Sequence, residues 1–288
     1  MLRIEESSQW LLVTHPDHAR LAGEFARAWG NAEFAAPEPR HDILVAVERH
    51  DDAWVERDSQ PCLTRDRRPA AFSRELVGSY NAFEDIQLAD YLRVRGQATE
   101  GVAADNPYAA ILVSMHTLNL LTEQADLTKL SPEDILLHRN FVERQRERQR
   151  ALLANVSKIE AHDAALLPGQ LDRAFRFLQA CDSLSLTACV RYAKPIALRH
   201  DHPRRNGQSA TLECQPLGQD VYRVAPYPFN EDELSFQVPF RRIPKQVFPN
   251  EAALRVVYAK ATQEFFTVKI VRHSVALTPS TLLLANSA

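Results

Sequence analysis

Glycine is scarce in this sequence. The 288-residue chain contains eight glycines, whereas glycine ordinarily makes up about 7% of a protein. No segment has the spacing G-x-G-x-x-G, G-x-S-x-G, or G-x-x-x-x-G-K followed by Ser or Thr. In those motifs glycine lets the backbone approach a phosphate or turn sharply beneath a nucleophilic serine. The sequence therefore gives no basis for a Rossmann, P-loop or nucleophile-elbow enzyme.

Long hydrophobic runs and closely spaced cysteine pairs are also absent. The longest apolar runs, such as residues 108–113, are far shorter than the roughly 20 residues that cross a bilayer. The first residues are acidic and lack the hydrophobic core of a signal peptide. The four cysteines show no C-x-x-C spacing, which favours reduced thiols. We therefore expect a soluble, cytoplasmic protein.

Charge of either sign is nearly balanced, with a formal net charge of −3 at pH 7. This balance argues against a general electrostatic attraction to nucleic acid or to a membrane surface. The arginine-rich run 144–150 contains both signs of charge and predicts a solvated helix face. The sequence leaves homo-oligomer formation open.

Hydrophobic periodicity predicts a mainly helical protein with a small β-rich part. Helical spacing recurs in segments 14–30, 40–54, 73–94, 106–123, from 131 onward and 169–189. Alternating segments predict an N-terminal hairpin at 2–13 and strands at 221–224, 234–238 and 265–271, with a helix at 250–262 between the last two. Residues 57–75 read as an irregular basic loop and 200–207 as a turn. We expect a helical domain over 1–197, and a small α+β region over 205–275 that packs on it and is joined by the hairpin.

Several ionisable residues interrupt the apolar helix faces: His18, the doublet His50-Asp51, His116 and Asp182. A buried carboxylate without a partner is costly, so it normally pairs, takes up a proton or binds a metal. Imidazoles and carboxylates are the ligands that suit iron, manganese, zinc or magnesium. Four such groups from three helices could hold one divalent ion and leave positions open for water and substrate.

Each of these residues also has a purely structural interpretation. Asp182 can hydrogen-bond between helices or form a buried salt bridge with Arg176 or another arginine. His18 and His116 can be hydrogen-bonded core histidines. The other histidines are expected at a helix end, at the bundle edge or in a solvated turn: His15, His138, His200 and His202.

The ordered set of histidine, histidine-aspartate doublet, histidine and aspartate resembles the pattern of the HD-domain superfamily, whose members are helical metal-dependent phosphohydrolases. More narrowly, several segments resemble DUF3891, an uncharacterised bacterial family. The segments that carry this resemblance are 17–22, 46–54, 107–116, 178–186 and 226–229. They span most of the chain up to the strand-rich tail.

The resemblance implies an HD-like bundle over residues 1–197 and a role for each matching residue. The implied metal ligands are His18, His50, Asp51 and Asp182. His116 is implied to contact phosphate or a second metal, and Asp52 to contact a second ion or to orient His50. Two-metal members of the superfamily have further paired histidines, whereas this chain offers only His116 and His138. We therefore expect one divalent ion, which is Mn, Fe, Zn or Mg.

These roles predict a metal-dependent phosphohydrolase that acts on a small phosphorylated molecule or a nucleotide. The ion would activate a phosphoryl oxygen and a water molecule. The arginines of the loop after the doublet are predicted to contact the substrate, because a guanidinium matches phosphate geometry: Arg65, Arg67 and Arg68. The alternative is a non-catalytic helical protein that keeps a degenerate site for a ligand or a partner. Metal content separates the two hypotheses.

Overall fold

The fold is α/β, not mainly helical. The structure is a computed structural model that describes residues 1–77, 87–158, 165–167 and 169–273. Helices contain 48% of the residues and strands 24%, and the described strands form a single sheet of eight. The predicted HD-domain-like helical bundle with a small β-rich C-terminal region is therefore wrong. Strands from both ends of the described chain build one large sheet, which the helices cover.

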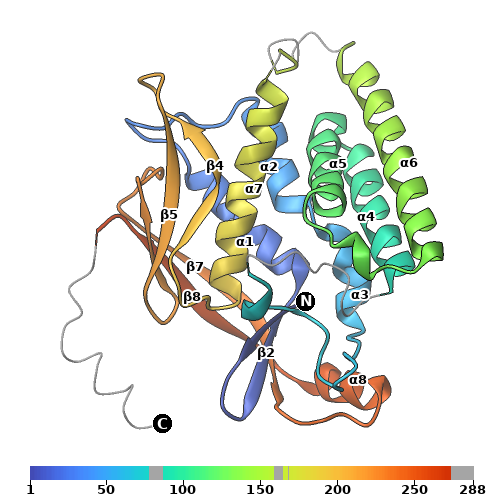
Figure 1. Ribbon diagram of the computed structural model, residues 1–288. Helices are drawn as coiled ribbons and strands as arrows, with labels where there is room; N and C mark the ends of the chain where they lie inside the picture. Colours follow the sequence, from blue (N-terminus) through green and yellow to red (C-terminus); the bar gives the residue numbers. More distant parts are fainter. Residues whose placement is uncertain (78–86, 159–164, 168, 274–288) are drawn as a thin grey trace.

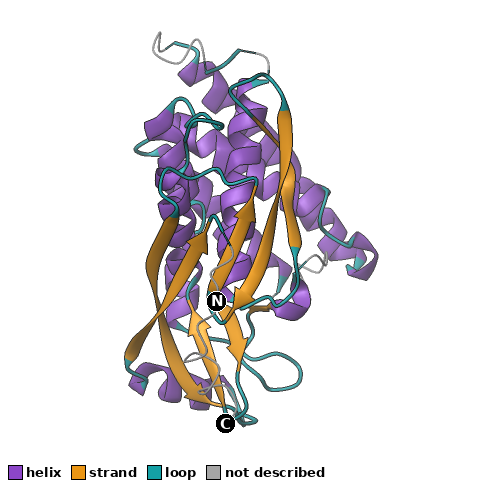
Figure 2. Ribbon diagram, turned by 90° about the vertical axis from the view of Figure 1, so that its left-hand side faces the viewer, coloured by secondary structure: helices purple, strands orange, loops and turns teal. Residues whose placement is uncertain are grey.

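The sheet is mixed and curls into a half-barrel (Figure 2). Its strand order is β3-β1-β2-β7-β8-β6-β5-β4. The pairs β1–β3 and β6–β8 are parallel, and the other pairs are antiparallel. The strands are β1 (Leu2–Glu5), β2 (Gln9–Val13), β3 (Phe72–Ser73), β4 (Ile196–Pro203), β5 (Ser209–Gly218), β6 (Val221–Ala225), β7 (Glu233–Pro244) and β8 (Gln263–Val271).

Strand β2 connects the N-terminal hairpin to the C-terminal strands. It pairs with β1 on one side and with β7 on the other, where Gln9 lies opposite Pro244. Both faces of β2 are buried: Leu11 belongs to the main hydrophobic core, whereas Trp10 and Leu12 pack in a second cluster. Because successive side chains of a strand point to opposite faces, β2 contributes to the main core on one face and to the second cluster on the other.

The helices are arranged in layers on the sheet (Figure 1). Helices α1 and α7 pack against the sheet, α2 and α5 pack on them, and α4 and α6 lie outermost. The helices are α1 (His15–Ala28), α2 (Arg40–Arg49), α3 (Val55–Ser59), α4 (Leu88–Ala103), α5 (Pro107–Thr122), α6 (Pro132–Val156), α7 (Gln170–Cys189) and α8 (Glu251–Lys260), with short 3-10 segments η1 (Asp52–Trp54), η2 (Arg74–Leu76) and η3 (Leu127–Lys129). None of the described helices has the length and hydrophobicity needed to span a bilayer.

Three predicted helix starts are formed by side-chain caps. Thr14, Asn106 and Ser131 each accept a hydrogen bond from the backbone N–H three residues later. This contact satisfies one of the donors that a helix start leaves free. The capped helices are α1, α5 and α6, and two of them carry candidate metal ligands.

Other boundaries differ from the sequence prediction. The helix expected over 40–54 ends at Arg49, because Asp51 has φ −119° and ψ 15° and starts the η1 turn. The helix expected over 73–94 is observed as α4 from Leu88 onward, and residues 78–86 lie outside the described part. The predicted turn at 200–207 is partly strand, since β4 continues to Pro203.

Burial of β2 on both faces predicts a large loss of stability when its tryptophan is truncated. Trp10 is 2% exposed. We expect Trp10→Ala to lower the free energy of unfolding by about 3–5 kcal/mol, as for other buried aromatic residues. Val247→Ala is the control, because Val247 is 70% exposed and should change stability by less than about 0.5 kcal/mol. Urea denaturation measures both, and equal losses would contradict the burial of Trp10 between the sheet and α8.

Candidate metal centre

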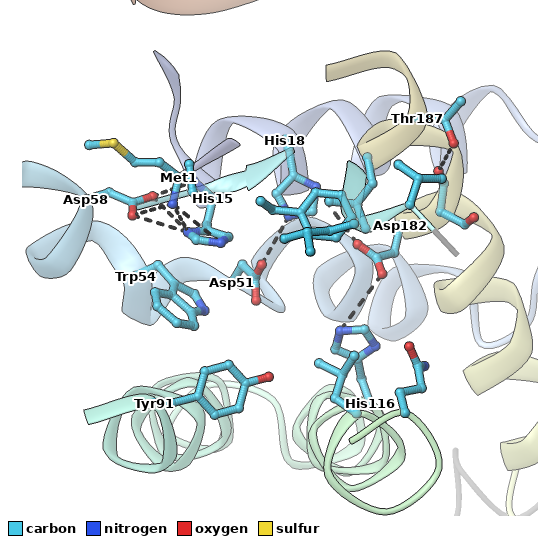
Figure 3. A pocket seen from close by; sticks show the side chains of 18 of the residues that line it. Met1, His15, His18, Asp51, Trp54, Asp58, Tyr91, His116, Asp182 and Thr187 are labelled. Carbon is cyan, nitrogen blue, oxygen red and sulfur yellow. Dashed lines mark hydrogen bonds and ion pairs between the residues drawn. The ribbon is translucent and has the colours of Figure 1, made fainter. Parts of the chain in front are cut away.

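Four parts of the chain bring ionisable side chains together between the helical layers (Figure 3). His18 lies on α1, His116 on α5 and Asp182 on α7, while His50 and Asp51 occupy the break between α2 and η1. His18, His50, Asp51 and His116 are all less than 5% exposed. The irregular backbone at the break lets two adjacent residues point at the same cluster.

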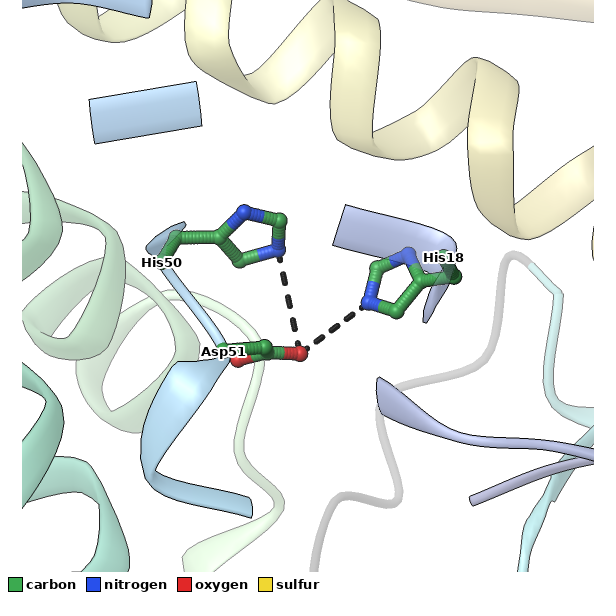
Figure 4. A group of neighbouring side chains, drawn as sticks. All are labelled: His18, His50 and Asp51. Carbon is green, nitrogen blue, oxygen red and sulfur yellow. Dashed lines mark hydrogen bonds and ion pairs between the residues drawn. The ribbon is translucent and has the colours of Figure 1, made fainter. Parts of the chain in front are cut away.

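The donor atoms of these residues form two overlapping groups. His18 Nε2 lies 3.0 Å from Asp51 Oδ2, and His50 Nε2 lies 3.7 Å from the same oxygen (Figure 4). His50 Nε2 also lies 3.3 Å from Asp182 Oδ1, and His116 Nε2 lies 4.0 Å from Asp182 Oδ2. Within the group His18–His50–Asp51, and within His50–His116–Asp182, the ligand atoms lie within 4.8 Å of one another. The structure thus brings the sequence-predicted ligands into two adjacent groups that share His50.

Hydrogen bonds orient the two central imidazoles. His50 Nδ1 donates to the backbone carbonyl of Val47 at 2.8 Å. Ser185 Oγ donates to the carbonyl of Asp182 at 2.9 Å, so it accepts from His18 Nδ1 at 3.0 Å. In a neutral imidazole only one nitrogen carries a proton, so in the neutral form of each ring Nε2 of His18 and of His50 presents a lone pair. Both lone pairs face carboxylate oxygens, an arrangement that requires a proton or a cation between them.

Asp51 is held by a buried ion pair with Arg95, a residue of α4. Arg95 donates to Asp51 Oδ1 at 2.6 Å, and its guanidinium also lies over the rings of Trp54 and Tyr91. Burial raises the pKa of the Asp51 carboxyl, but Arg95 and His50 outweigh burial and hold this pKa well below its usual range. Asp51 is therefore an anion although it is buried.

The neighbouring imidazoles differ in their affinity for a proton. Burial lowers the pKa of His50, but Asp51 and Asp182 outweigh burial and raise it to about 9. Burial also lowers the pKa of His116, and there it prevails over the attraction of Asp182 and brings the pKa to about 3. The position between Asp51 and Asp182 therefore attracts positive charge, whereas His116 is a neutral donor or acceptor.

The cluster opens into a cavity of about 380 Å³, within the size range of small-molecule sites. His18, Asp51, His116 and Asp182 line its floor (Figure 3). Apolar and aromatic side chains from η1, α4, α5, α7 and the 61–77 segment form much of the remaining wall: Trp54, Tyr91, Phe72, Leu76, Val77, Leu120 and Leu186.

Other residues predicted to act in the site lie away from the donor atoms. Asp52 is not among the residues lining the cavity and pairs with Arg49 at 3.0 Å. The loop arginines predicted to bind phosphate are exposed, and none of them lines the cavity: Arg65, Arg67 and Arg68. The arginines of this basic loop therefore do not form part of the wall of this cavity.

The structure also tests the purely structural interpretations of Asp182 and His138. Arg176 pairs with Asp172 at 2.8 Å, and among the described residues no arginine forms an ion pair with Asp182, whose partners are histidines. His138 is buried and contacts the Leu121 carbonyl at 2.9 Å. Asp182 instead faces three histidines.

Sequence reasoning missed two groups in the cavity, Arg95 and the pair His15–Asp58. His15 Nδ1 lies 3.1 Å from Asp58 Oδ2, and the His15 ring stacks on Trp54 with 4.4 Å between centroids. Burial and the nearby amino group of Met1 lower the pKa of His15 to about 4. Arg95 gave a usable signal, because it is an arginine on the otherwise apolar face that begins at Tyr91. Asp58 could not be recognised in this way, because its short helix α3 has no apolar face that a charged residue would interrupt.

The family model for a protein of unknown function, DUF3891, matches residues 1–245. The match covers most of the chain, and the chain belongs to this family. It includes all the candidate ligands and the strands from β1 to the end of β7. No curated protein and no solved structure matches the chain significantly.

The ion pair of Arg95 predicts that the guanidinium is essential for stability. Arg95→Met should lower the free energy of unfolding of the metal-free protein by about 3–5 kcal/mol, because it leaves Asp51 buried without its main partner. Arg93→Met is a matched control on the same helix, because Arg93 is exposed and should change stability by less than about 0.5 kcal/mol. If urea denaturation gives similar values for both variants, the ion pair does not stabilise the buried charge.

Proposed function

We propose that this protein is a metal-dependent phosphohydrolase that acts on a small phosphorylated molecule or a nucleotide. One observation carries the proposal: Nε2 of His18 and Nε2 of His50 point at the carboxylates of Asp51 and Asp182, while the other nitrogen of each ring is engaged by Ser185 Oγ or by the Val47 carbonyl. His50 Nε2 is buried without a hydrogen-bond partner among the described residues, despite lying 3.3 Å from Asp182 Oδ1. A divalent cation would supply the positive charge that these nitrogens and carboxylates share.

The donor set fits a divalent transition metal. Two imidazoles and two carboxylates from α1, α7 and the α2–η1 break would hold the ion: His18, His50, Asp51 and Asp182. Such N and O donors suit Mn, Fe or Zn, and carboxylates also suit Mg. When bound, the ion supplies Lewis-acid activation of a phosphoryl oxygen and of water. The cavity beside the cluster gives a small substrate access to it.

The chain's own residues would orient and tune this site. Val47 and Ser185 fix the imidazole tautomers, and Arg95 keeps Asp51 ionised. Partners of this kind are a regular part of metal sites, and their loss lowers metal affinity. His116 is neutral, so it can donate or accept a hydrogen bond to a substrate oxygen without adding charge.

The order of the donors along the chain also supports the proposal. Histidine, histidine-aspartate, histidine and aspartate follow one another as in the HD-domain superfamily. The similarity lies in the donors and their order and not in the architecture, because the fold here contains a large sheet. A reaction is assigned by the site rather than by the fold.

Metal content tests the donor assignment directly. We expect Asp182→Ala to lower the metal bound per chain strongly, after loading with Mn²⁺ and removal of free ion, because it deletes one of the four ligands. Asp52→Ala should retain the metal, because Asp52 pairs with Arg49 outside the cavity. Elemental analysis by mass spectrometry measures both variants. The same metal content in the two proteins would refute the proposed ligand set.

Hydrolysis tests the reaction. The Mn²⁺- or Fe²⁺-loaded protein should hydrolyse some phosphate ester or phosphoanhydride in a panel of nucleotides, dinucleotides and small phosphomonoesters. In His50→Ala the rate should fall by about a thousandfold, since several kcal/mol of transition-state stabilisation would be lost with the ion. His41→Ala is the control, because His41 is exposed on the same helix.

Thermal melts of these variants separate loss of activity from loss of the fold. His50→Ala should stay folded, because alanine is a good helix former and Val47 anchors the same turn. Metal binding without turnover across the panel would favour a non-catalytic, ligand-binding protein. Failure of the wild type to bind any divalent ion would refute the hydrolase proposal.

A further inference from the structure

The cavity contains a basic residue, Arg199, that has no ion-pair partner among the described residues. It lies on β4, is half-buried and lines the cavity. Within the described ranges no carboxylate lies within ion-pair distance of its guanidinium. The other cavity arginines are paired: Arg95 with Asp51 at 2.6 Å and Arg57 with Asp90 at 3.6 Å. Arg199 is therefore the cavity's available guanidinium among the described residues.

The backbone around Arg199 is irregular. The register between β4 and β5 shifts between Ala197 and Asp201, and His200 has φ +66°. A non-glycine residue in this left-handed region costs on the order of 1 kcal/mol. Leu198 and His202 are buried, whereas Ala197 and Arg199 line the cavity. Bulges of this kind re-aim side chains beside functional sites.

A hydrogen bond ties this irregular segment to the helix that carries Asp182. His200 Nε2 lies 2.7 Å from Gln179 Oε1, and Gln179 is three residues before Asp182 on α7. The rise of an α-helix is about 1.5 Å per residue, so Gln179 and Asp182 lie within one turn. Gln179, Asp182 and Ser183 all line the same cavity. Arg199 is thus held beside the turn of α7 that faces the candidate metal centre.

We infer that Arg199 binds the phosphoryl oxygens of the substrate, and that the substrate is a phosphate monoester. The inference of substrate class rests on the proposed function. Asp51 and Asp182 balance the charge of a divalent ion, and Arg95 and Arg199 then contribute two positive charges. A phosphate monoester carries a second ionisable oxygen with a pKa near 6, so it is largely dianionic at neutral pH and matches this charge, whereas a diester carries one negative charge. A guanidinium can bind two phosphoryl oxygens at once.

Calorimetric titration with inorganic phosphate tests the anion site without requiring turnover. The wild type, Arg199→Gln and Arg68→Gln are compared, each in metal-free and Mn²⁺-loaded form. Arg199→Gln should raise the dissociation constant about tenfold or more, as expected for loss of a charged hydrogen-bond pair. Arg68→Gln should leave the constant unchanged, because Arg68 is exposed outside the cavity. Equal constants for the wild type and Arg199→Gln, or no phosphate binding by the wild type, would overturn the inference.

A conservative variant covers the case in which Arg199→Gln fails to fold. Arg199→Lys keeps the charge but loses the two-pronged geometry, so it should bind phosphate more weakly than the wild type and more tightly than any neutral variant that folds. Wild-type affinity in Arg199→Lys, when Arg199→Gln is unfolded, would overturn the claim that two oxygens are bound. Circular dichroism establishes which variants are folded.

A comparison of KM for a phosphate monoester and a phosphate diester tests the substrate class. In the metal-loaded enzyme Arg199→Gln should raise KM for p-nitrophenyl phosphate by about tenfold or more, and should raise KM for bis-p-nitrophenyl phosphate less. An equal rise for both esters would overturn the monoester assignment. Phosphate binding that depends on Arg199 in a protein without metal binding or turnover would refute the hydrolase proposal and retain the anion site.

Discussion

The buried charge of Asp51 is the constraint on which the arrangement of the helices depends. An ionised carboxylate is tolerated in a protein interior only when charged or hydrogen-bonded partners surround it. Asp51 receives Arg95 from α4 and faces His18 from α1, while its neighbour His50 faces Asp182 from α7. The helices that supply these partners are therefore fixed relative to one another by charge as well as by packing.

The same helices transmit the position of the sheet to the site. On α1, Phe25 belongs to the main core and contacts the ring of Phe236 on β7, while His18 turns to the donor cluster. On α7, Leu178 is in that core, while Asp182 lies in the cavity. Each of the two helices thus has one face on or near the sheet and another toward the cavity. The curl of the sheet therefore sets the distance between His18 on α1 and Asp182 on α7.

The ionisable residues of the cluster could be singled out from the sequence, whereas the sheet that supports them could not. A charged residue on an apolar helix face stands out locally, and this identified His18, His50 and Asp182. The sheet depends on pairing between distant segments, and β4 contains the polar run 200–202 followed by Pro203, which has the composition of a turn. The arginines show the same limit: loop position indicated Arg65, Arg67 and Arg68, whereas the cavity contains Arg95 and Arg199. Arg95 had a local signal on its apolar helix face, but only the tertiary structure places Arg199 there.

The pairing of β2 with β7 has a consequence for how the chain is made. Arg242 on β7 donates a hydrogen bond to Gln9 on β2, a residue 233 positions away in sequence. On the ribosome, the edge of β2 that pairs with β7 therefore stays unpaired until residues 241–244 have been synthesised. Contacts of such long sequence separation form slowly, and unpaired apolar strands are prone to associate with other chains. In this chain, the unpaired edge of β2 is therefore a place where association with other chains can occur during synthesis.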